Sequence, residues 1–131
     1  MADHRGPLYD RIGGEAGVLA LVAAFYDRIQ TDPAMAILHR LHLRGNGVGH
    51  SRVEQARFLS GFLGGPRLYV EHHGHSNVRQ MHEHVTIDQT ARDAWLLCME
   101  QTVSDLGIDQ ETSEDLMRHF RRVAYLLQNA P

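Results

Sequence analysis

The segment GGEAGVLALVAAFYDRIQ, residues 13–30, decides the fold class of this chain. Its two opening glycines are typical of a break, and the residues after them carry an apolar side chain at every third or fourth position. These positions are Val18, Val22, Phe25, Tyr26 and Ile29. Because that spacing puts side chains on one face of an α-helix, the pattern predicts a helix over 15–30 that buries this face.

The rest of the chain shows the same periodicity, in segments that begin at recognisable caps. Asp32, Asp88 and Asp109 each stand before such a segment, and Ser51 with Glu54 has the spacing of a capping box. The expected helices cover 33–42, 51–63, 77–84, 88–106 and 109–127, with a glycine-rich loop over 43–50. Residues 66–77 are polar and rich in histidine, and they fit no pattern clearly. No segment alternates like a strand, so we expect an all-α fold and a single domain over 1–131.

Composition and charge exclude several classes of protein. The 131 residues fit one domain, and 13 lysines and arginines against 16 aspartates and glutamates leave a formal charge of −3. We expect no nucleic-acid partner, because binding to phosphates needs a basic surface. No apolar run approaches the ~20 residues that span a bilayer, so no membrane association is expected. The single cysteine, Cys98, predicts a chain without internal disulfides in a reducing, cytoplasmic compartment.

Ten histidines beside one cysteine and one tryptophan raise the question of metal binding. Imidazole is a good ligand for zinc, copper and nickel, and a short stretch holds His72, His73, His75, His82 and His84. The spacing argues against a single site among them, since adjacent helical residues point in different directions. The zinc motifs His-Glu-x-x-His and Cys-x-x-Cys are absent from the sequence.

A flat apolar cofactor, held between helices by one axial histidine, accounts for more of the sequence pattern than a metal site made of several histidines does. Such a site needs an inward histidine, bulky apolar side chains facing it and a few polar donors on the far side. His82 lies on the apolar side of the helix expected around it. The facing apolar residues are Phe58, Leu59 and Phe62, and the inward polar residues are Tyr26, Gln55 and Trp95. Gln55 is informative because a buried amide costs free energy unless it finds partners.

Nearly the whole chain resembles the truncated haemoglobins, the short globins built as a two-over-two helical sandwich, and more specifically their second group. The motifs that carry the resemblance are Gly13-Gly14, Phe25-Tyr26, the segment FLSGFLGGPRLY at 58–69, Gly74-His75, VRQMH at 78–82 and RDAWLLCM at 92–99. Together these motifs are specific for the family, although none of them is so alone.

The resemblance implies a haem b cofactor and assigns roles by position. His82 is expected to be the proximal ligand of the iron, and the distal residues are expected to be Tyr26, His42, Gln55 and Trp95. Further haem contacts are expected from Ser51, Phe58, Leu59, Tyr69, His75, Arg79, Met81, Val85 and Trp95. Relatives often carry basic residues where this chain has Met81 and Glu54, so its propionate contacts are expected from Arg79, Tyr69 or His75. The remaining histidines expected to be solvated are His4, His39, His72, His73, His84 and His119.

The function that follows from the resemblance is reversible binding of dioxygen, nitric oxide and carbon monoxide by an oxygen-carrier type of globin. Polar distal donors slow the release of dioxygen, so Tyr26→Phe is expected to speed it. Two alternatives stay open: a nitric oxide dioxygenase or peroxidase-like enzyme, which needs an unidentified reductant, and a haem-free, histidine-rich metal-binding module. His42, or else His50, is a candidate sixth ligand of the iron in the absence of gas. We expect a monomer or a homodimer.

Overall fold

The computed structural model describes residues 6–44, 47–75, 77, 80, 82 and 85–131, and every regular element in this part of the chain is helical. The elements are α1 (Leu8–Arg11), α2 (Gly14–Thr31), the 3-10 turn η1 (Pro33–Met35), α3 (Ala36–Arg44), α4 (Val48–Phe62), α5 (Leu68–His73), α7 (Gln89–Asp105) and α8 (Gln110–Leu127). The prediction of an all-α fold is confirmed. The helix expected over 77–84 falls largely on residues outside the described part of the chain.

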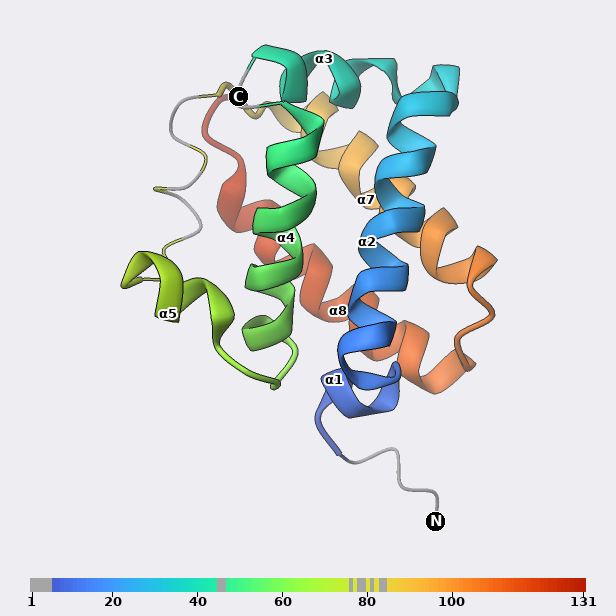
Figure 1. The fold of residues 1–131 in the computed structure, drawn as a ribbon. Coiled ribbons are helices and arrows are strands. Elements are labelled where there is room, and N and C mark those ends of the chain that lie inside the picture. Colours follow the sequence, from blue (N-terminus) through green and yellow to red (C-terminus); the bar gives the residue numbers. More distant parts are fainter. Residues whose placement is uncertain (1–5, 45–46, 76, 78–79, 81, 83–84) are drawn as a thin grey trace.

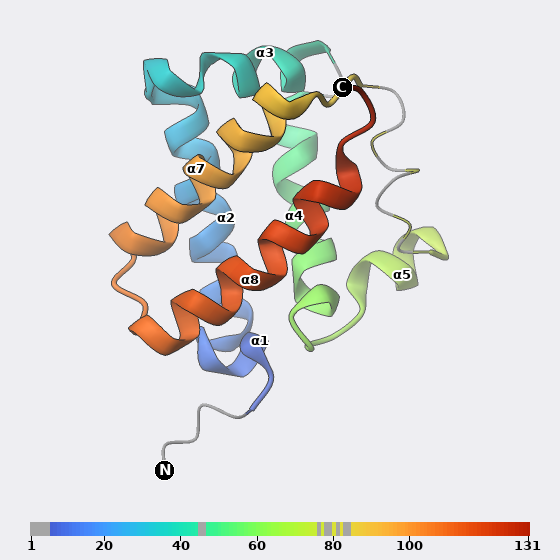
Figure 2. The ribbon, with the colours of Figure 1, turned by 180° about the vertical axis from the view of Figure 1, so that it is seen from behind.

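Two antiparallel helix pairs form two crossed layers (Figure 1). α2 and α4 make one layer, and α7 and α8 run behind them as the second layer, as the view from behind shows (Figure 2). α3 crosses one end of both layers, and α5 lies beside α4. This is the two-over-two sandwich that the resemblance implied.

The core lies where the two layers face each other. The predicted apolar face of α2 is buried there, with every one of its five residues at most 4% exposed, and Leu21, which was not predicted, is buried beside it. Phe120 of α8 meets it from the other layer and is also fully buried. Burying a side chain of this size contributes about 1.5–3 kcal/mol, so this interface supplies much of the drive to fold. Leu106 was expected to point inward, but it is 38% exposed because it lies in the turn after α7, beyond the region that α8 covers.

Aspartate caps set the starts of several helices as predicted. Backbone N–H groups donate to the carboxylates of Asp32, Asp88 and Asp109 at 3.0, 2.9 and 3.0 Å. The capping box at Ser51 is wrong, because α4 begins at Val48, after Gly47 with its φ of +91°. A glycine in the left-handed region starts this helix early and shortens the expected loop. Ser51 therefore lies one turn inside α4, on the same face as Gln55.

The junction between α1 and the end of α4 depends on close backbone approach. The backbone N–H of Tyr9 donates to the carbonyl of Leu63 at 2.8 Å. A Cβ atom on Gly65 would overlap the Tyr9 ring, so only glycine fits between them. The Gly64-Gly65-Pro66 motif thus ends α4 and seats α1 against it.

α5 is a helix that sequence patterning did not reveal. None of its residues is fully buried, and its side chains include Glu71, His72 and His73. A six-residue helix of this kind has no apolar stripe, because it rests on α4 through only part of its surface. In the described part of the chain no helix is both long and apolar enough to cross a membrane.

Candidate functional site

A cavity of about 300 Å³ opens between the two layers, and its walls come from α2, α3, α4, α5, α7, α8 and the segment that leads into α7. Most of the residues predicted for the site line this cavity. They are Tyr26, His42, Ser51, Gln55, Phe58, Leu59, Tyr69, His82, Val85 and Trp95. The fold thus brings together side chains that lie up to 69 residues apart in the sequence, from Tyr26 to Trp95.

Four of the residues predicted for the site are not among the described lining residues: Phe62, which stacks on Phe58 and Phe120 instead, and His75, Arg79 and Met81. Arg79 and Met81 lie outside the described residues, as do His4 and His84 among the histidines expected to be solvated. His75 packs beside the Tyr69 ring at 6.0 Å between ring centroids but is not among the lining residues.

The sequence reasoning missed part of the wall. The additional lining residues are Leu38, Leu41, His50, Glu54, His73, Ile87, Ala91, Arg92, Phe120, Val123, Ala124 and Leu127. Phe120, Val123 and Leu127 belong to the apolar stripe of α8, which periodicity identified as a buried face. Periodicity cannot tell a face that packs on another helix from one that borders a cavity.

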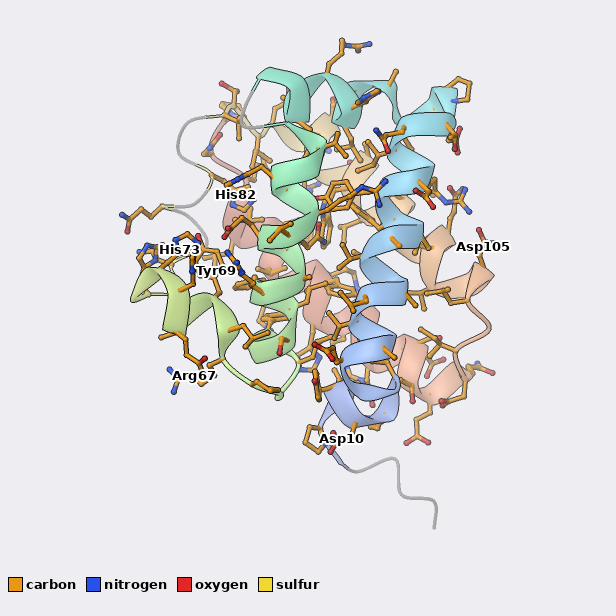
Figure 3. All side chains as sticks on the ribbon, in the orientation of Figure 1. Asp10, Arg67, Tyr69, His73, His82 and Asp105 are labelled. Atoms are coloured by element: carbon orange, nitrogen blue, oxygen red, sulfur yellow. The ribbon has the colours of Figure 1, made fainter. Side chains whose placement is uncertain are left out.

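His82 is a half-buried imidazole at the wall of this largely apolar space. It comes from the segment between α5 and α7, and Val85 and Ile87 follow it along the same wall. Figure 3 shows His82 beside α4, above Tyr69 and His73 of α5. One imidazole surrounded by apolar side chains is the arrangement that an axial ligand of a flat cofactor requires.

A hydrogen-bonded pair, Tyr26 and His42, lies in the wall between α2 and α3. The Nδ1 atom of His42 lies 2.7 Å from the carbonyl oxygen of Leu38, which can only accept, so Nδ1 carries the proton. In the neutral ring Nε2 is then an acceptor, and the Tyr26 hydroxyl donates to it at 3.3 Å. Both nitrogens of His42 are thus engaged, and its binding to an iron would require the Tyr26 bond to break.

Burial controls the protonation of this pair. It raises the pKa of the Tyr26 hydroxyl above its ordinary range, an effect that the Arg52 guanidinium opposes only in part. Burial also lowers the pKa of His42, while its bond to the Leu38 carbonyl acts in the opposite direction. At pH 7 the pair therefore holds a protonated phenol and a neutral imidazole.

Two other polar side chains in the wall, Trp95 and Gln55, make no hydrogen bond through their side chains to the described residues. Trp95 packs its ring against Phe25 and Phe120, with centroids 5.8 and 5.7 Å away. Within the described residues no acceptor bonds its indole N–H, and none bonds the Gln55 amide. Both groups line the cavity, so both can donate to a molecule bound inside it.

The polar rim of the cavity lies between α4 and α5. The His73 Nε2 atom is 2.6 Å from a carboxylate oxygen of Glu54, and the His73 ring packs against the Tyr69 ring in a tilted arrangement, with 4.2 Å between ring centroids. His73 is exposed, as the sequence predicts, and the fold adds a carboxylate partner on α4.

The donor set fits a haem. The cavity has the size of a small-molecule site, most of its lining is apolar, and the imidazole of His82 lies in its wall as a candidate axial ligand. The N–H groups of Trp95 and Gln55 supply the polar contacts that a bound gas requires. Phe58 and Leu59 of α4 supply apolar side chains for a flat ring.

Comparisons with known proteins agree with this fold. A family model described as bacterial-like globin matches residues 7–129. A cold-adapted truncated haemoglobin from Pseudoalteromonas haloplanktis TAC125 is 39% identical, with a TM-score of 0.86 over 95% of this chain and 98% of the other. The group II two-on-two haemoglobin of Agrobacterium tumefaciens is 33% identical, with a TM-score of 0.89 over 100% of both chains. A truncated oxygen-avid haemoglobin from Bacillus subtilis is 31% identical, with a TM-score of 0.81 over 95% of this chain and 100% of the other.

Proposed function

Because this chain belongs to the bacterial-like globin family and is a truncated haemoglobin of group II, we propose that it reversibly binds dioxygen and other diatomic gases. Membership of the globins implies a haem cofactor. The proposal adds that this is haem b, that His82 is its proximal ligand and that residues 1–131 form one globin domain. When bound, haem supplies a ferrous iron to which dioxygen, nitric oxide and carbon monoxide can attach. The Bacillus subtilis relative, described as oxygen-avid, supports dioxygen as a ligand.

The observation that carries the proposal is Trp95, which lines the cavity and whose indole N–H has no acceptor among the described residues. An indole nitrogen can only donate, so it prefers a molecule that draws negative charge when bound. A largely apolar surrounding strengthens such a hydrogen bond. A hydrogen bond to a charged acceptor contributes about 1.5–3 kcal/mol, which favours slow release over rapid delivery.

Tyr26 takes part less directly. Its single proton is shared with His42 Nε2 at 3.3 Å, which is long for a hydrogen bond of this type. The hydroxyl can turn toward a bound gas only by leaving the imidazole nitrogen without a donor. We therefore assign Trp95 and Gln55 as the main donors and Tyr26 as a weaker one, controlled by the protonation of His42.

Acid is expected to slow the release of dioxygen by about two- to tenfold. This change in rate corresponds to the free energy of one additional neutral hydrogen bond to the bound gas. Protonated His42 donates from Nε2 to the Tyr26 oxygen, which frees the Tyr26 proton for the cavity. Because burial lowers the pKa of His42 below its usual 6.5, the release rate should be constant above that pH and fall below it. Stopped-flow release measured from pH 8 to pH 5 checks this.

The His42→Phe variant should lose this pH dependence, and His39→Ala serves as the matched control. His39 and His82 both contribute positive charge that lowers the pKa of His42, so His39→Ala should move the midpoint slightly upward and keep the slope. A release rate that keeps its acid response in His42→Phe would contradict the assignment.

The function itself is tested by two spectroscopic experiments on the purified wild-type protein. A Soret band is expected, and its absence after attempted reconstitution would leave only the haem-free, histidine-rich module. Stopped-flow mixing of the dioxygen-equilibrated protein with nitric oxide then separates binding from turnover. Simple exchange of one gas for the other supports the carrier function. Rapid conversion to the ferric form with production of nitrate would assign the dioxygenase reaction instead.

A further inference from the structure

A cluster of three metal-binding side chains lies on the outer side of the cavity rim. Glu54 of α4 faces His72 and His73, the last two residues of α5. The His73 Nε2 atom is 2.6 Å from the Glu54 Oε2 atom, and the His72 ring stands edge-on to the His73 ring at 4.6 Å. The atoms that could bind a metal all lie within 4.8 Å of one another.

Neighbouring side chains hold the cluster in place. Tyr69, one turn before His73 on α5, packs against the His73 ring with 4.2 Å between ring centroids, and the imidazole reaches Glu54 of α4. Arg57 binds the other carboxylate oxygen of Glu54 at 3.1 Å, which leaves Oε2 facing the histidines. The sequence argument that adjacent histidines diverge is wrong here, because they end a short helix and both rings lie close together.

We propose that Glu54, His72 and His73 bind a divalent transition-metal ion of the zinc type. Two imidazole nitrogens and one carboxylate oxygen are a ligand set that Zn²⁺ uses in proteins, whereas Mg²⁺ and Ca²⁺ prefer oxygen ligands alone. Zn²⁺ holds such ligands at about 2.0–2.2 Å, so tetrahedral donors stand about 3.3 Å apart. The cluster has to contract by only about 1–2 Å at its widest pair, and His72 is exposed and can turn.

Binding exchanges one interaction for another. The ion replaces the hydrogen bond between His73 Nε2 and Glu54 Oε2, and Nε2 binds the ion without a proton, which moves to Nδ1 or to solvent. Solvent water completes the coordination on the exposed side. The positive charge of Arg57 opposes the ion, so we expect moderate affinity. The bound ion would tie α5 to α4 at the cavity rim, and the site uses neither His82 nor the cofactor.

Isothermal titration calorimetry tests the site: zinc chloride is added to the full chain as it is purified, and the heat of binding is measured. We expect one Zn²⁺ per chain at this site, and His73→Gln, His72→Gln or Glu54→Gln should each weaken it by about tenfold or more. These conservative replacements sit at the surface, and circular dichroism verifies that each variant is folded. His39→Gln removes a histidine from α3, outside the cluster, and should leave the affinity unchanged.

X-ray absorption at the zinc edge provides a second measurement that iron does not disturb. The wild-type spectrum should show two imidazoles among ligands at about 2.0–2.1 Å. No saturable binding, or binding that falls as much in His39→Gln as in the cluster variants, would overturn the proposal. In that case Glu54 and His73 form an ion pair only. Loss of the Soret band would leave this result unaffected, so the two proposals fail independently.

Discussion

The His82→Gly variant is expected to purify without a Soret band and with less than a tenth of the wild-type haem content. His82 is the imidazole on the cavity wall for which we propose the iron bond. Without it the apolar walls alone have to retain the cofactor, and an axial bond cannot be replaced by contacts with Phe58 or Leu59. The ratio of haem absorbance to protein absorbance, measured after reconstitution with excess hemin, checks this result.

Added imidazole provides a sharper form of the same test. Glycine at position 82 leaves space for free imidazole, which should restore the Soret band in His82→Gly at millimolar concentration. His75→Gly is the matched control, because His75 lies beside Tyr69 but does not line the cavity, and it should keep its haem without imidazole. Normal haem content in His82→Gly would show that another residue is the proximal ligand.

Trp95→Phe is expected to speed the release of dioxygen by about ten- to a hundredfold. The change removes the indole N–H and keeps an aromatic ring against Phe25 and Phe120. The lost hydrogen bond to a charged acceptor is worth about 1.5–3 kcal/mol, and every 1.36 kcal/mol changes the rate tenfold. Stopped-flow replacement of dioxygen by carbon monoxide measures the rate directly.

Two comparisons separate the hydrogen bond from a change of cavity shape. Phe58→Leu alters the apolar wall without removing a donor, so its release rate should stay within about threefold of wild type. Tyr26→Phe should speed release as the sequence predicts, but by less than Trp95→Phe, since His42 already holds the Tyr26 proton. A larger effect in Tyr26→Phe would reverse the order of the donors. An unchanged rate in Trp95→Phe would remove Trp95 from the site.

Several parts of the fold could be predicted because they depend on local interactions. Asp32, Asp88 and Asp109 cap their helices through bonds within three residues, so short sequence patterns identify them. The apolar face of α2 is equally local, since helical periodicity alone defines it. The start of α4 was mispredicted because Gly47 competes with the capping box at Ser51, and only backbone geometry decides between them.

The candidate site also has features that could be predicted from the sequence and features that could not. Ten of the residues expected for the site line the cavity. Six of them follow from the side-chain pattern alone, and the resemblance added His42, Ser51, Tyr69 and Val85, because family motifs keep their positions when the fold is the same. It could not supply the partner of Tyr26, which depends on the orientation of His42 toward the Leu38 carbonyl. Nor could it place Glu54 next to His73, because these residues lie on different helices and 19 positions apart.

The sequence by itself determined the class of the molecule: helical periodicity, aspartate caps and paired glycines suffice for an all-α chain, and its motifs suffice for the globin resemblance. The tertiary structure decided which polar groups remain available to a ligand. A hydrogen bond forms between specific atoms and depends on distances of a few ångströms, whereas periodicity reports only which face of a helix is buried. The packing of α3 on α2 occupies the Tyr26 proton, and the packing of α5 on α4 gives the surface histidine His73 a carboxylate partner.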